Sequence, residues 1–262
     1  MLQQLGAHSL ALAVYPGLLA MAIFGVIAEV AWTLMAERAW LLPALSLRRP
    51  APSLVLGAAL GAMAASQLAA PFNFISAQER NLLIALAAIA FMQWTSEQLP
   101  DRAELLLVAQ LSWVVAVLGP AVEPQSLRPS VLGAALVPGL IPLKVACGLL
   151  YLLCLPVLLR LAPTPPKEAR QSPARFDGAR ALRWFPYCGL FATLYFPPSG
   201  DDLLGVLRFV GLTLAAAFAA GLIAILLRRQ GPAHVPALYR LVVGPFTVFV
   251  LLLVVATSLI MR

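Results

Sequence analysis

The sequence predicts an all-α fold, that of a polytopic integral membrane protein with about eight transmembrane helices. Of the 262 residues, 61% are hydrophobic and only 11% are charged, whereas soluble domains carry about 25% charged residues. The mean hydropathy is +0.91. Apolar runs of about 20 residues, the length that crosses a bilayer, recur along the chain. We therefore expect a single membrane domain over residues 1–262.

Eight apolar segments are predicted to be spans, covering residues 10–36, 53–71, 82–98, 104–121, 132–160, 184–198, 203–227 and 238–261. The first is too long for the apolar part of a signal peptide, and no Lys or Arg precedes it. The sixth is short and carries proline near both ends. It is still expected to cross, because the charge distribution requires an even number of spans.

Basic residues distinguish the two sides of the predicted membrane protein. With eight spans and the N-terminus outside, most loop Lys and Arg residues fall on the inner side. The outer side receives Arg80, Arg128 and the terminal Arg262. Cytoplasmic loops of membrane proteins carry such an excess, so both termini are predicted to lie outside. The residues 162–183 then form a basic cytoplasmic loop between spans five and six.

Two of the charged residues that fall within predicted spans are proton-path candidates. Glu29 lies well inside the first span, where a carboxylate is costly. It is either a proton-handling group or a carboxylate close enough to the inner interface to meet water or Arg38. Lys144 lies in the outer half of the fifth span. It either belongs to a buried ion path, opposite an acid such as Glu123, or snorkels to the surface.

The sequence contains no self-contained active site. Phosphate-binding, zinc-protease and Asp-rich magnesium motifs are absent. The two histidines, His8 and His234, are predicted to lie on opposite sides of the membrane. Cys147 and Cys154 would lie about 10 Å apart along a helix, too far for a disulfide. We expect no catalytic residue, no metal site and no cofactor held by this chain alone.

Several short segments, taken in chain order, carry a resemblance to a known family: "YPGLLAMAIFGVIAEVAW", the basic "ERAWLLPALSLRRPAP", "APFNF", "NLLIALAAIAF", "LLLVAQLSW" and "LLRRQGPAHVPALYRLVVGPFTVFVLLLVV". Their order and topology resemble the membrane subunit that bounds the quinone site of respiratory complex I, known as NADH dehydrogenase subunit 1. Relatives of that protein occur in membrane-bound hydrogenases and formate hydrogenlyases. The resemblance covers about residues 10–261 and implies eight spans with the N-terminus outside.

The loop at 162–183 departs from the family. In the family this loop is acidic, borders the quinone cavity and starts the polar path into the membrane. Phe176 and Asp177 resemble its beginning, and Tyr187 with the next two residues resembles its end, with Pro186 in place of Glu. The intervening "GARALRWF" contains no acid. Phe176, Asp177 and Tyr187 are therefore candidates for a degenerate quinone loop. The missing acids put the family's quinone and proton chemistry in question for this chain.

The resemblance implies a non-catalytic, membrane-anchoring subunit of a redox-driven, ion-translocating assembly in the bacterial inner membrane. Its partners would be other membrane subunits, membrane lipids and a peripheral electron-transfer module, without nucleic acid. A quinone would be shared at a subunit interface. The basic surface predicted to dock the module or anionic headgroups comprises Arg170, Arg175, Arg180, Arg183 and Trp184. The alternative is a stand-alone transporter or lipid-handling membrane protein.

Overall fold

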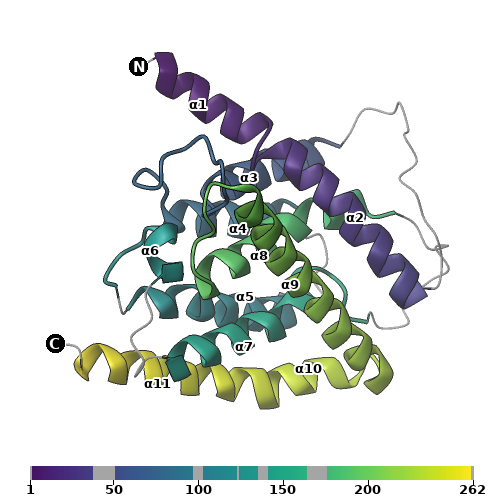
Figure 1. The fold of residues 1–262 in the computed structure, drawn as a ribbon. Coiled ribbons are helices and arrows are strands. Elements are labelled where there is room, and N and C mark those ends of the chain that lie inside the picture. Colours follow the sequence, from purple (N-terminus) through teal and green to yellow (C-terminus); the bar gives the residue numbers. More distant parts are fainter. Residues whose placement is uncertain are drawn as a thin grey trace.

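The computed structural model describes residues 2–37, 51–96, 103–122, 124–134, 141–163 and 176–260 (Figure 1). Within these ranges every regular element is helical, so the predicted all-α class is confirmed. The elements are α1 (Leu2–Ala13), α2 (Leu18–Glu37), α3 (Pro52–Ser66), α4 (Leu82–Ser96), α5 (Ala103–Leu118), η2 (Gly119–Ala121), α6 (Pro129–Ala134), α7 (Ile141–Leu158), α8 (Gly178–Tyr195), α9 (Leu203–Gln230), α10 (His234–Leu238), η4 (Tyr239–Val243) and α11 (Gly244–Ile260).

In the part of the chain that the structure describes, five helical segments are long and apolar enough to cross a membrane: His8–Ala36, Ala103–Ala121, Ile141–Leu158, Leu203–Gln230 and His234–Leu259. Two further apolar helices, over Pro52–Ser66 and Leu82–Thr95, are shorter. The sixth predicted span coincides in part with α8, which is helical but carries several polar side chains. The length and apolar character of these helices are those of a membrane protein.

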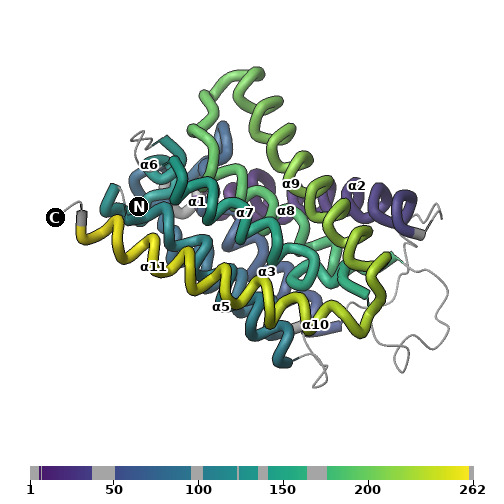
Figure 2. The backbone as a smooth tube through the Cα atoms, turned by 90° about the horizontal axis from the view of Figure 1, so that it is seen from below, coloured from purple at the N-terminus to yellow at the C-terminus, as the bar shows by residue number. Residues whose placement is uncertain are grey.

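Helix α8 lies at the centre of the bundle. Its residues from Ala181 onward are almost all buried, because α2, α3, α6, α7 and α9 pack around it. Figure 2 shows α11 along one edge of this arrangement. In contrast with α8, α9 and α11 expose many large apolar side chains, including Leu207 and Leu252. Helices that are apolar on their outer faces suit a lipid environment.

Prolines interrupt some of the predicted spans. The first predicted span is divided at residues 14–17, which contain Pro16, so α1 and α2 are separate helices. Proline lacks the backbone N–H that continues a helix. Near the other end, the π-helix η4 comes directly before Gly244 and Pro245. By contrast, Pro156 and Pro186 lie inside α7 and α8, which continue through them.

Helices α2 and α8 approach each other closely at Gly25. A Cβ atom at this position would lie 2.1 Å from the backbone O of Ala181. No side chain fits there without moving one helix, so the contact requires glycine. Residues four apart lie on the same helix face, so Glu29 faces the beginning of α8 as well.

Candidate functional site

A buried ion pair joins α2 to the beginning of α8. The Glu29 side chain is fully buried, and its carboxylate pairs with the Arg180 guanidinium. Arg180 Nε donates to Oε2 at 2.8 Å and to Oε1 at 3.1 Å, and Nη2 also donates to Oε1. The indole N–H of Trp184 donates to Oε2 at 3.2 Å. Hydrogen bonds between charged groups are stronger than neutral ones, so this carboxylate is a strong link between the two helices.

The first turn of α8 is held by a second acid. Asp177 is the N-cap residue, and its side chain accepts from the backbone N–H groups of Ala179 at 3.0 Å and Arg180 at 3.2 Å. These amides have no partner within the helix, so the cap stabilises its start. The backbone N–H of Asp177 donates in turn to Glu29 Oε1 at 3.4 Å. The chain is therefore tied to α2 at the point where α8 begins.

Two further arginines reach the end of α7 from neighbouring helices. Arg183 Nη1 donates to the backbone O of Leu158 at 3.2 Å. Arg228 Nε donates to the backbone O of Leu161 at 3.3 Å, and its guanidinium lies 4.7 Å from the centroid of the Trp32 ring. Carbonyl groups at a helix C-terminus lack helical partners and attract positive charge. The arginines thus join α7, α8, α9 and α2 at one end of the bundle.

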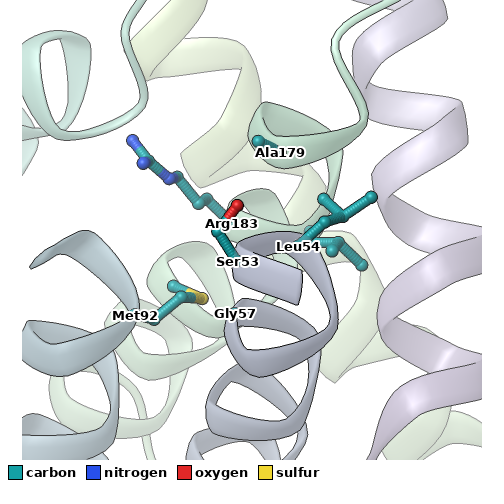
Figure 3. Close-up of a pocket in the computed structure, with 7 residues that line it drawn as sticks. Ser53, Leu54, Gly57, Met92, Ala179 and Arg183 are labelled. Carbon is teal, nitrogen blue, oxygen red and sulfur yellow. The ribbon is translucent and has the colours of Figure 1, made fainter. Parts of the chain in front are cut away.

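A cavity of about 200 Å³ lies beside this cluster, between α3, α4 and α8. Its lining residues are Ser53, Leu54, Gly57, Met92, Ala179, Leu182 and Arg183. In Figure 3 the guanidinium group of Arg183 extends away from the other labelled residues, consistent with its bond to α7. The hydroxyl of Ser53 is then the main polar side-chain group that this lining offers to a ligand.

Tyr187 lies deeper in the bundle and takes part in packing. Its hydroxyl donates to Gln93 Oε1 at 3.4 Å, and its backbone O accepts from the Tyr151 hydroxyl at 2.7 Å. Its ring centroid lies 5.3 Å from that of Trp113, in an edge-to-face arrangement. These contacts join α8 to α4, α5 and α7. Within them, Tyr187 has a clear structural role.

Lys144 belongs to α7 and lies near the C-terminal end of α8, opposite the end that carries Arg180. Its Nζ donates to the backbone O atoms of Leu132 at 3.1 Å and Gly133 at 3.2 Å, at the end of α6. Gly133 packs so closely on α8 that a Cβ atom there would lie 2.7 Å from the backbone O of Thr193. Along α8, Thr193 is about 20 Å from Arg180 at the usual helical rise. The two proton-path candidates therefore do not form one polar site.

The structure brings together four residues that the sequence singled out: Glu29, Asp177, Arg180 and Trp184. Contact with water or with Arg38, the partners suggested from the sequence, stays a prediction for Glu29. Its ionic partner is Arg180, which is 151 positions away in the chain, and residue 38 lies outside the described ranges. The available signal was that Glu29 lies in the inner part of the first predicted span, and Arg180 lies in the inner loop four residues before the sixth.

The structure describes three of the five residues predicted for the docking surface, and all three are buried. Arg180, Arg183 and Trp184 are buried, with 9%, 1% and 2% of their surface exposed. Their side chains bond other helices and do not form an exposed surface, so the prediction is wrong in that respect. Arg170 and Arg175 lie outside the described residues, and for them it stays a prediction. Phe176, the other quinone-loop candidate, is half-buried beside the α8 cap.

Among the residues that the structure describes, no group of three or more His, Cys, Asp or Glu side chains is placed to hold a metal ion. Cys147, Cys154 and Cys188 are free, buried thiols, so the expectation that the first two form no disulfide is confirmed. A scan against models of known protein families found no match, and a search of curated proteins found none either.

Proposed function

We propose that this chain is a membrane-anchoring subunit of a redox-driven, ion-translocating assembly, of the complex I or membrane-bound hydrogenase kind. It crosses the bacterial inner membrane eight times with both termini outside, and its inner side holds a peripheral electron-transfer module. It works with other membrane subunits and is not itself catalytic. Support comes from the ordered segments that resemble NADH dehydrogenase subunit 1 and from the arrangement at the beginning of α8.

The buried pair of Glu29 and Arg180 is the observation that carries this proposal. Helix α8 follows the loop that the resemblance matches to the quinone-site loop, and the pair ties the first turn of α8 to α2. A loop with one end fixed loses less conformational entropy when a partner binds. A carrier, by contrast, needs its polar site near the middle of the membrane. Here the buried charges lie toward the two ends of α8.

The cavity beside the first turns of α8 does not by itself fit a quinone ring. The cavity beside α8 has a volume of about 200 Å³, below the roughly 300–1,000 Å³ of ordinary ligand pockets. The hydroxyl of Ser53 is its main donor, since Arg183 bonds α7 and Tyr187 bonds Gln93. We therefore assign no step of quinone chemistry to this chain. A quinone shared at an interface with another subunit stays a prediction.

The basic loop before α8 is the proposed docking element. Arg170 and Arg175 belong to it, and Arg229 is exposed at the end of α9, next to Arg228, which reaches the end of α7. A basic surface steers and orients an acidic partner. The exposed Arg240 contributes less, because it is paired with Glu104.

Affinity purification of the tagged chain from native membranes in mild detergent tests the proposal. Iron–sulfur and antiporter-like subunits are expected to copurify with the unaltered chain. The double variant Arg170→Glu and Arg175→Glu should lower recovery of the iron–sulfur subunits by about tenfold, which corresponds to about 1.4 kcal/mol. The antiporter-like subunits should be retained.

The matched control is the double variant Arg128→Glu and Arg262→Glu, which makes the same change in charge on the side predicted to be outside. It should keep the iron–sulfur subunits. Equal recovery with both variants would contradict the assigned docking surface. Purification of the unaltered chain as an isolated species of 27.9 kDa would instead favour the stand-alone transporter.

A further inference from the structure

The connection between α3 and α4, residues 67–81, is held in one shape by side chains that bond its backbone. Asn73 Nδ2 donates to the backbone O atoms of Ser66 at 2.9 Å and Leu68 at 3.0 Å. Arg80 donates twice to the backbone O of Ile75, at 2.8 and 2.9 Å, and once to that of Leu68 at 3.2 Å. These hydrogen bonds make the connection a compact, ordered loop and not a simple spacer.

Phe72 occupies an unusual position in this connection. Its φ angle is +52°, a left-handed conformation that bulky residues rarely adopt. Its backbone N–H donates to Asp201 Oδ1 at 2.7 Å, which holds the strained turn to the segment before α9. Burial lowers the pKa of the Arg80 guanidinium, and the nearby Asp201 carboxylate opposes that shift. Asp201 thus interacts with the connection at two places, the Phe72 backbone and the Arg80 side chain.

This rigid turn presents aromatic rings on the outside of the protein. Phe72 is 54% exposed and Phe74 is 47% exposed. Strained backbone that persists in a well-supported loop frequently serves a function. In the same connection, the residues 76–79, "SAQE", are exposed as well, and they are mainly polar. The connection therefore has an apolar part followed by a polar part.

The apolar part lies next to a helix of membrane-spanning length. Asp201, which bonds Phe72, lies two residues before the start of α9, where Leu203 and Leu204 are 75% and 73% exposed. Since α9 is long and apolar enough to cross a membrane, these leucines are suited to contact lipid. The exposed leucines at the start of α9, close in the fold to Phe72, favour lipid as the occupant over a protein partner.

We propose that Phe72 and Phe74 form an interfacial membrane anchor. Their rings enter the lipid at the end of the bundle where α9 begins, while residues 76–79 face water. The strained backbone at Phe72 and its bond to Asp201 set the direction of the rings. The anchor fixes the depth of α3, α4 and α9 in the bilayer, and it does not depend on the function proposed above.

Site-directed fluorescence of the full chain in phosphatidylethanolamine–phosphatidylglycerol vesicles tests this anchor. A polarity-sensitive label is attached to Phe74→Cys, Phe72→Cys or the control Gln78→Cys. The native cysteines are buried, so the unsubstituted chain serves as the labelling blank. Lipids with brominated acyl chains should quench the labels at 72 and 74 at least about twofold more than the label at 78. Iodide in the water should show the reverse order.

The variant at 74 keeps the test valid if replacement of Phe72 disturbs the strained turn. Equal quenching at 74 and 78 by the brominated lipids would overturn the anchor. Protection of the label at 74 from both quenchers would also overturn it, because it would indicate a protein contact in place of lipid.

Discussion

Replacement of Glu29 by glutamine tests the central contact of the structure. The variant keeps the volume of the side chain but removes the negative charge opposite Arg180, which is bonded through both Nε and Nη2. The groups around the carboxylate, including the Trp184 indole N–H, all donate hydrogen bonds to it. The glutamine amide N–H₂ would therefore face other donors. Removal of one member of a buried ion pair costs about 3–5 kcal/mol. That is a large share of a total stability of about 5–15 kcal/mol.

The chain contains a matched control for this measurement. Glu104 pairs with Arg240, but the two side chains are 73% and 68% exposed. An exposed pair contributes about 0–1 kcal/mol, so Glu104→Gln should be nearly neutral. Both variants are unfolded by denaturant in the same detergent, with tryptophan fluorescence as the signal. Small and equal losses for the two variants would refute the assignment of Glu29 as the link between α2 and α8.

A double-mutant cycle separates the pair from its surroundings. Arg180→Gln should cost about as much as Glu29→Gln, because each leaves one charge without its present partner. The combined variant should cost less than the sum of the two, by about 0.5–3 kcal/mol, since residues in contact couple. Strictly additive losses would contradict a direct interaction.

Two further predictions use the same unfolding measurement. Gly25→Ala would place a Cβ atom 2.1 Å from the backbone O of Ala181 and should cost about 1–3 kcal/mol of stability through overpacking. Its control is Gly57→Ala, whose Cβ atom meets no atom closer than 3.8 Å. That variant should leave stability unchanged or raise it by up to about 1 kcal/mol. Asp202→Ala removes the cap that accepts from the Gly205 N–H at 2.7 Å and should cost about 1 kcal/mol. Asp202→Ser should restore most of that loss, and failure to do so would argue against capping.

Hydropathy predicted the position of the apolar helices well, because a span-length apolar run has few alternatives. The prediction of 203–227 corresponds to Leu203–Gln230, and 104–121 corresponds to Ala103–Ala121. It was weakest for α8, predicted from residue 184 but beginning at Gly178. The cap at Asp177 was the missed signal, since an Asp before a helical run marks a helix start. Hydropathy favours apolar residues, so it did not include the buried arginines in the helix.

The partners of the candidate site could be predicted only in part. A charge inside an apolar run signals that some compensating group exists, and this correctly drew attention to Glu29. The identity of the partner depends on the packing of α2 against α8, which brings residues 151 positions apart into contact. The local sequence around Glu29 does not show which distant residue will pack against it. The same limit explains why Arg180 and Arg183 were expected on the surface, where unpaired arginines normally lie.

The bonds that hold α8 also constrain any proton path through this chain. A carboxylate accepts a proton only through an oxygen that is accessible, and both oxygens of Glu29 already accept from Arg180. Proton transfer at Glu29 therefore requires the guanidinium to leave, and this would loosen the first turn of α8 with its cap at Asp177. Lys144 offers no direct continuation, because it bonds the end of α6 about 20 Å further along α8. Anchoring requires the ion pair to stay closed, and conduction requires it to open during each turnover.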